Sequence, residues 1–167
     1  SISVDLGFEG FITQSANFSV LTSVSQNEWK LQESGGGILF RPFGRSSQDT
    51  GLTVRGGIFQ LTEKGMFANS TSEFKASAPY AGADAKLYLL PFLGGKIDYL
   101  QTFETSSDEL GGKWQMQRLR YGGFIEFSLL QFEFFAARSD YILRPNSGSA
   151  EVKEAVDGYG LAGSLFF

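Results

Sequence analysis

The chain ends in Asp157-Gly-Tyr-Gly-Leu-Ala-Gly-Ser-Leu-Phe-Phe167. Alternate residues of this stretch differ in character. Tyr159, Leu161, Leu165 and Phe167 belong to one parity, which is mostly apolar, and the other parity is mostly small or polar. A period of two places successive side chains on opposite faces of a β-strand. The ending therefore predicts a strand whose two faces meet different environments.

Similar alternation recurs along the chain and predicts an all-β protein with a single domain over residues 1–167. Polar stretches at 13–34, 63–78, 105–112 and 144–156 predict four long connections, and short turns separate the remaining segments. Even strand number and alternating long and short connections are typical of an up-and-down arrangement. The predicted strands are Ile2–Phe8, about Gly35–Phe43, Gly51–Thr62, Tyr80–Phe92, Lys96–Phe103, Lys113–Glu126, Gln131–Leu143 and Tyr159–Phe167.

Composition restricts the chemistry of the chain. The 167 residues include no Cys and no His, so thiolate metal sites, disulfides and the usual general base near neutral pH are excluded. No motif selects a pair of acids for catalysis, and no dense Lys/Arg block suggests nucleic acid. We therefore expect a protein that is not an enzyme, with no catalytic residues, no cofactor, no metal and no nucleic-acid partner.

Alternation alone fits a soluble ligand-binding barrel, apolar inside, and a membrane barrel, apolar outside. Apolar segments of about ten residues match the length of a tilted strand that crosses hydrocarbon. Aromatic residues also gather near the predicted strand ends, where a membrane barrel has its girdles. One expected rim carries Phe43, Phe92, Phe127 and Phe167, and the other carries Phe8, Tyr80, Phe103 and Trp114. These features favour the membrane interpretation.

The polar parity of the strands would then face the lumen. It contains six acids and six bases, which are Asp5, Glu9, Asp84, Asp98, Glu126 and Glu133 with Arg41, Arg55, Lys86, Lys96, Arg118 and Arg120. The interior of an eight-stranded barrel is just wide enough for its own side chains, so buried charges must be paired. The balance predicts a lumen that is filled and blocked to ions; a gated pore is the alternative. Trp114 and Met116 fall out of phase with strand 113–126, which predicts a bulge or an extension there.

Over essentially its full length the chain resembles the small eight-stranded outer-membrane barrels of the OmpA/OmpX type. The resemblance rests on the ending, the rhythm of the connections and the aromatic rims. It implies a closed antiparallel transmembrane β-barrel in the outer membrane of a Gram-negative bacterium, and a mature chain from which a signal peptide has been removed. It also implies contact with outer-membrane lipid and lipopolysaccharide. During biogenesis the barrel-assembly machinery would read Tyr159, Leu161, Leu165 and Phe167.

Two functions fit these expectations. The first is a structural or surface-interaction protein whose long extracellular loops contact a surface ligand. The alternative is a passive, porin-like channel for small, hydrophobic molecules, since Gly35-Gly-Gly37, Pro42 and Gly56-Gly57 could weaken strand pairing in the wall.

Overall fold

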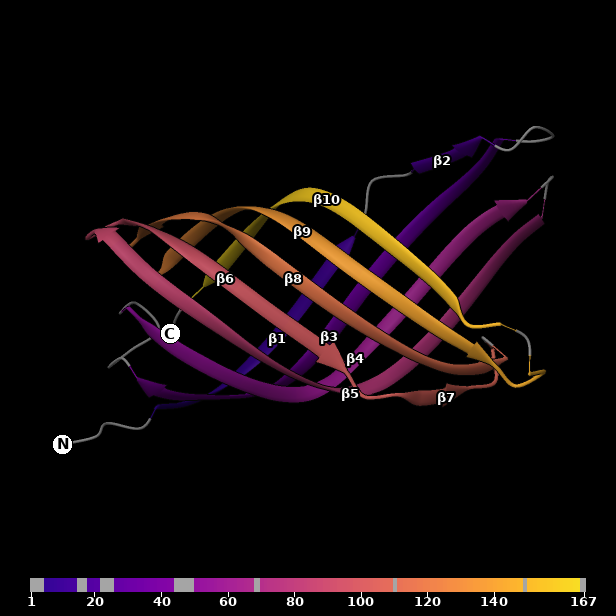
Figure 1. The fold of residues 1–167 in the computed structure, drawn as a ribbon. Coiled ribbons are helices and arrows are strands. Elements are labelled where there is room, and N and C mark those ends of the chain that lie inside the picture. Colours follow the sequence, from indigo (N-terminus) through magenta and orange to yellow (C-terminus); the bar gives the residue numbers. More distant parts are fainter. Residues whose placement is uncertain are drawn as a thin grey trace.

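The computed structural model describes residues 5–14, 18–21, 26–43, 50–67, 70–109, 111–148 and 150–165. No helix in this part of the chain has the length and apolarity that a membrane crossing requires. All regular structure in these ranges is β-strand (Figure 1). The strands are β1 (Asp5–Gln14), β2 (Phe18–Leu21), β3 (Gln26–Phe43), β4 (Gly51–Phe67), β5 (Ser70–Leu90), β6 (Leu93–Thr102), β7 (Thr105–Ser107), β8 (Gly112–Phe127), β9 (Leu130–Pro145) and β10 (Val152–Leu165).

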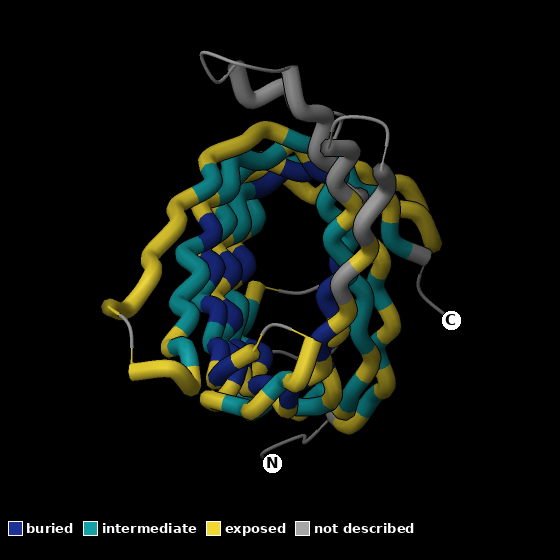
Figure 2. The backbone as a smooth tube through the Cα atoms, turned by 90° about the vertical axis from the view of Figure 1, so that its right-hand side faces the viewer, coloured by how far each residue is buried: buried dark blue, intermediate teal, exposed yellow. Residues whose placement is uncertain are grey.

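The strands form one antiparallel up-and-down sheet. Its order is β1-β3-β4-β5-β6-β8-β9-β10, and the short strands β2 and β7 pair with β3 and β8. The strands are tilted (Figure 1) and follow one another around a common axis (Figure 2). This arrangement confirms the predicted all-β class and the up-and-down order.

The sheet is open between its first and last strands in the described part of the chain. β10 pairs with β9 from Val152 to Leu165, as expected, and β1 pairs with β3 from Asp5 to Gln14. Within the described ranges no ladder joins β10 to β1. Residues 1–4 and 166–167 lie outside the described residues.

The predicted extent of the long polar connections is wrong, because strands occupy much of the segments concerned. β3 begins at Gln26, inside the expected 13–34 connection, and β4 and β5 leave only residues 68–69 between them. β7 lies inside 105–112, and β10 begins at Val152, inside 144–156. The ladder satisfies backbone N–H and C=O groups whatever the side chains are, so it continues where the apolar face has ended.

Of the two alternatives expected near Trp114, a bulge or an extension of the strand, the bulge is wrong. The pairing of β8 with β9 runs without a break from Gly112 opposite Pro145 to Phe127 opposite Leu130. Trp114 and Met116 share the inward parity of Arg118 and are buried. Register irregularities occur instead between Phe40 and Phe43 of β3, around Pro42, and between Tyr88 and Leu90 of β5.

A buried apolar cluster fills the interior toward the end where β4 meets β5 and β8 begins. Tyr80 and Trp114, expected at a rim, are part of it, so that expectation is wrong; their inward parity explains their burial. Phe8 and Phe103 of the same rim are exposed, as are Phe92 and Phe127 of the other. The side chain of Phe43, and Phe167, lie outside the description. The buried members are Phe59, Leu61, Ala76, Ala78, Tyr80, Leu100, Trp114 and Met116.

The outer face of the sheet carries an apolar belt. Large apolar side chains on the outward parity of every long strand are strongly exposed, with Tyr159 at 94% and Phe8 at 87%. The belt ends at staggered positions. Polar outward residues begin at Gln60 in β4, Gln117 in β8, and Arg138 and Asp157 in β9 and β10. The stagger follows the tilt of the strands. The boundary at which the outward residues become polar therefore runs around the sheet roughly perpendicular to its common axis.

Candidate functional site: the luminal charge network

Alternation along each strand directs one parity of polar side chains into the interior. Arg55, Asp98, Arg118 and Glu133 are at most 9% exposed, although each is charged. Glu9, Arg41, Asp84, Lys96 and Arg120 are half-buried on the same parity, and Lys86 and Glu126 are buried. The side chain of Asp5 is not among those described.

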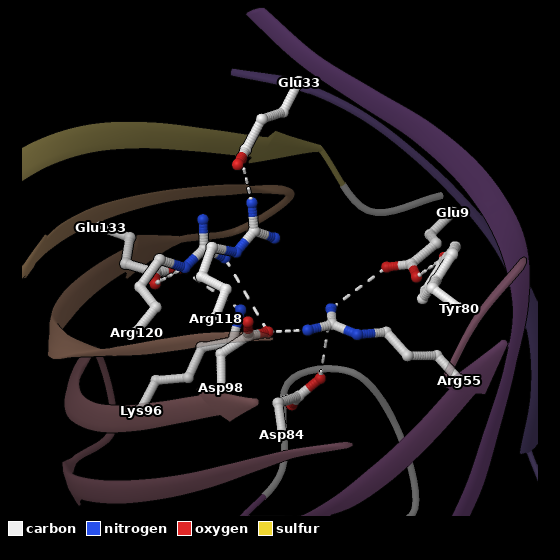
Figure 3. Close-up of polar contacts among 10 residues, drawn as sticks. All are labelled: Glu9, Glu33, Arg55, Tyr80, Asp84, Lys96, Asp98, Arg118, Arg120 and Glu133. Atoms are coloured by element: carbon white, nitrogen blue, oxygen red, sulfur yellow. Dashed lines mark hydrogen bonds and ion pairs between the residues drawn. The ribbon is translucent and has the colours of Figure 1, made fainter. Parts of the chain in front are cut away.

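Arg55 of β4 is the first centre of the network (Figure 3). Its Nη1 lies 3.2 Å from Glu9 Oε2 and 3.9 Å from Asp84 Oδ1, and its Nη2 donates to Asp98. The Tyr80 hydroxyl donates to the other oxygen of Glu9. One guanidinium therefore joins residues from β1, β5 and β6.

Glu133 of β9 is the second centre. Its Oε2 lies 3.3 Å from Lys96 Nζ, and its Oε1 lies 3.6 Å from Arg120 Nε. Arg120 Nη2 is also 4.0 Å from Asp98 Oδ2 (Figure 3). Asp98 is fully buried. It joins the two centres into one network across β1, β4, β5, β6, β8 and β9.

A third pair lies toward the short turns. Lys86 Nζ is 3.2 Å from Glu126 Oε2, and the Tyr88 hydroxyl donates to the same oxygen at 2.6 Å. Arg41, the remaining base, donates from Nη2 to Thr53 Oγ1 at 3.3 Å. The structure thus brings ten of the twelve expected luminal residues into ion pairs with one another or with a further acid.

That further acid is Glu33 of β3, which the sequence interpretation placed in a connection. It is 5% exposed, its Oε2 accepts from Arg118 Nη1 at 2.5 Å, and its Oε1 accepts from the Tyr141 hydroxyl at 2.7 Å. The sequence does contain a signal for the inward position of Glu33, because the inward parity of Arg41 continues through Gly35 to Glu33. Glu33 of β3 thus contacts β8 through Arg118 (Figure 3) and β9 through Tyr141.

Three luminal glutamates share one arrangement. Glu9, Glu33 and Glu126 each bind one base and one tyrosine hydroxyl, supplied by Tyr80, Tyr141 and Tyr88. A buried carboxylate is stable only when it is paired and hydrogen-bonded. Because a base and a hydroxyl already bind it, such a carboxylate is poorly suited to removing a proton from a substrate. Within the described residues, no group of three or more metal-ligating side chains is placed to hold an ion.

A separate, exposed charge cluster lies where β9 ends and β10 begins. Arg144 binds Glu104 and lies 2.7 Å from Glu151, and Lys113 and Lys153 flank the two acids at 3.5 and 3.0 Å. Hydrogen bonding to Arg144, and then to Lys153, lowers the pKa of Glu151 below its usual range. The cluster connects the segment after β6 to β8, β9 and β10.

Of the expected assembly signal, Tyr159 and Leu161 lie on the outward parity of β10 and are 94% and 71% exposed. Leu165 ends β10, but its side chain is not described, and Phe167 lies outside the described residues. Comparison with known proteins identifies no family, since no family model matches the chain and no curated protein matches it either.

Proposed function

We propose that the chain is a non-enzymatic outer-membrane β-barrel protein of the OmpA/OmpX type, with an occluded lumen and a structural or surface-interaction role. The observation that carries the proposal is the distribution of polarity. Charged side chains such as Asp98 and Glu133 are buried inside, whereas Phe8, Phe134 and Leu161 are exposed outside. A soluble barrel has the reverse distribution, and a membrane barrel has this one.

The dimensions of the strands support a membrane crossing. β6 has ten residues, which matches the roughly 9–11 residues that a tilted strand needs to cross hydrocarbon. The strands β3, β4 and β5 are longer, at 18, 17 and 21 residues, so they extend beyond the belt on the side where outward residues are polar. This extended sheet, rather than loops, would provide the surface for contact with a ligand outside the membrane.

Closure of the wall belongs to the proposal. An open edge in hydrocarbon leaves unsatisfied N–H and C=O groups that cost several kcal/mol each, so β1 and β10 should pair in the membrane. Lipid and lipopolysaccharide would then contact the belt. The outward, exposed Tyr159 and Leu161 would be available to the barrel-assembly machinery before closure.

A charge substitution in β10 tests the membrane crossing. Leu161 lies within the belt and Asp157 lies beyond it, both on the outward parity of β10. We expect Leu161→Lys to destabilise the protein folded into phospholipid vesicles by about 2–4 kcal/mol, the cost of a lysine deep in lipid. Asp157→Lys, the matched control, should change the unfolding free energy little. If both variants fold equally well in vesicles, or if the chain folds as a monomer without lipid or detergent, the proposal is wrong.

A second candidate function, a passive channel for small hydrophobic molecules, is favoured by the apolar cluster inside and by the absence of a ladder between β1 and β10 within the described ranges. Such a channel would carry an apolar dye into vesicles without carrying ions. Equal dye uptake by vesicles with and without the protein would exclude it.

A further inference from the structure

Phe135 of β9 lies between two glycines on the inward parity of the sheet. Gly122 of β8 stands opposite it on one side, and Gly160 of β10 stands opposite it on the other. A Cβ added at Gly160 would lie 2.5 Å from Cζ of the Phe135 ring, and its other near contacts belong to the same ring. A side chain at position 160 is therefore incompatible with the present position of that ring.

Arg120 of β8 lies over the Phe135 ring, with its guanidinium carbon 4.6 Å from the ring centroid. Its ion pairs are longer than hydrogen bonds, at 3.6 Å to Glu133 and 4.0 Å to Asp98. Arg120 Nε has no hydrogen-bond partner among the described residues. The cation–π contact with the ring therefore contributes to the position of this guanidinium.

The same combination of glycine, ring and base occurs twice more. In each case the ring stands directly opposite a glycine of the neighbouring strand, and a base lies over the ring. In these two cases the base also donates a hydrogen bond to a glutamate. The position of the base should therefore depend most strongly on the ring in the case of Arg120. The two further combinations are Gly35 with Phe11 and Arg118, and Gly94 with Phe124 and Lys86.

We infer that Gly160 is a positioning residue for the luminal network, because the space it leaves holds the Phe135 ring where Arg120 lies between Asp98 and Glu133. The inference adds a positioning residue to the proposed occluded lumen, and its significance rests on the proposed function. Gly160 is the best of the three glycines for a test, since a Cβ at Gly35 or Gly94 would also meet a backbone carbonyl oxygen.

The test measures how fast phenylglyoxal modifies Arg120 in the folded, detergent-solubilised chain, by peptide mapping. Arg138, whose side chain is 59% exposed, is the internal reference. Gly160→Ala should raise the relative rate at Arg120 about two- to fivefold, the factor for losing a contact of about 0.5–1 kcal/mol. Gly158→Ala is the matched control on the same strand and parity, where a Cβ meets nothing within 4 Å, and should leave the rate unchanged.

Two further variants keep the inference testable if Gly160→Ala does not fold. Phe135→Leu removes the ring and should raise the rate at Arg120, whereas Phe135→Tyr keeps the ring and should not. An unchanged rate in Phe135→Leu, or in folded Gly160→Ala, overturns the inference. Vesicle insertion is scored separately on the same samples. A chain that holds Arg120 over Phe135 but does not insert would refute the proposed function and leave the inference standing.

Discussion

At the scale of single residues, the interior is built from charges that are tolerated only as a set. Asp98 is fully buried and lies beside Arg55 and Arg120, so neither the acid nor the bases are isolated. Removing one member of a buried pair leaves an uncompensated charge, which costs more than the pair itself contributes. Glu33 illustrates this well, because it is the partner of Arg118 within the described side chains.

Replacement of Glu33 by Gln should therefore destabilise the protein by about 3 kcal/mol, since the buried Arg118 loses its counter-charge while Tyr141 keeps an acceptor. The double variant Glu33→Gln, Arg118→Met should recover most of that loss, because no charge then stays unpaired. Urea unfolding in detergent measures both values. Additive losses in the double variant would show that Glu33 and Arg118 are not coupled.

At the scale of elements, the phase of each strand was predictable from the sequence and its ends were not. Arg118 and Leu119, or Glu133 and Phe134, contrast so strongly that the faces of β8 and β9 are evident. Beyond the belt the outward face becomes polar, and the inward residues of segment 63–78 include small ones such as Ala76 and Ala78, so the contrast between the two faces is weak there, although β4 and β5 continue through it. Glu33 and Trp114 were misplaced for the same reason: their parity was right, but their neighbours broke the pattern.

The stability of the first residues of β10, which lie beyond the belt, should depend on pH through Glu151. Its lowered pKa means that folding favours the ionised form, so its contribution is present above the ordinary glutamate pKa and is lost as pH falls through the lowered value. At neutral pH, Glu151→Gln should speed amide exchange at Val152 and Lys153 relative to wild type, and the difference should vanish in acid. Glu154→Gln is a neighbouring control. A difference that persists in acid would mean that Arg144 does not act through this charge.

At the scale of the whole molecule, two different layers fill the interior one after the other along the axis. Leu31 precedes Glu33 in β3 and Met116 precedes Arg118 in β8, whereas Leu100 follows Asp98 in β6, which runs in the opposite direction. The apolar cluster therefore lies directly beyond the charge network on several strands. A hydrated ion would have to displace paired charges in one layer and packed apolar side chains in the other. Both displacements cost free energy.

Planar-bilayer recordings should therefore show no steady, large conductance for the wild-type chain. Trp114→Ala combined with Met116→Ala removes bulk from the apolar layer and should still leave the lumen closed, because Arg55, Asp98 and Glu133 remain paired in the layer below. Arg55→Ala alone unpairs the charges but leaves Trp114 and Met116 in place, so it should also stay closed where the protein folds. The lumen should conduct only when both layers are opened together. Steady conductance in the wild type would show that neither layer is a barrier, and conductance after the first change alone would assign the whole barrier to the apolar layer.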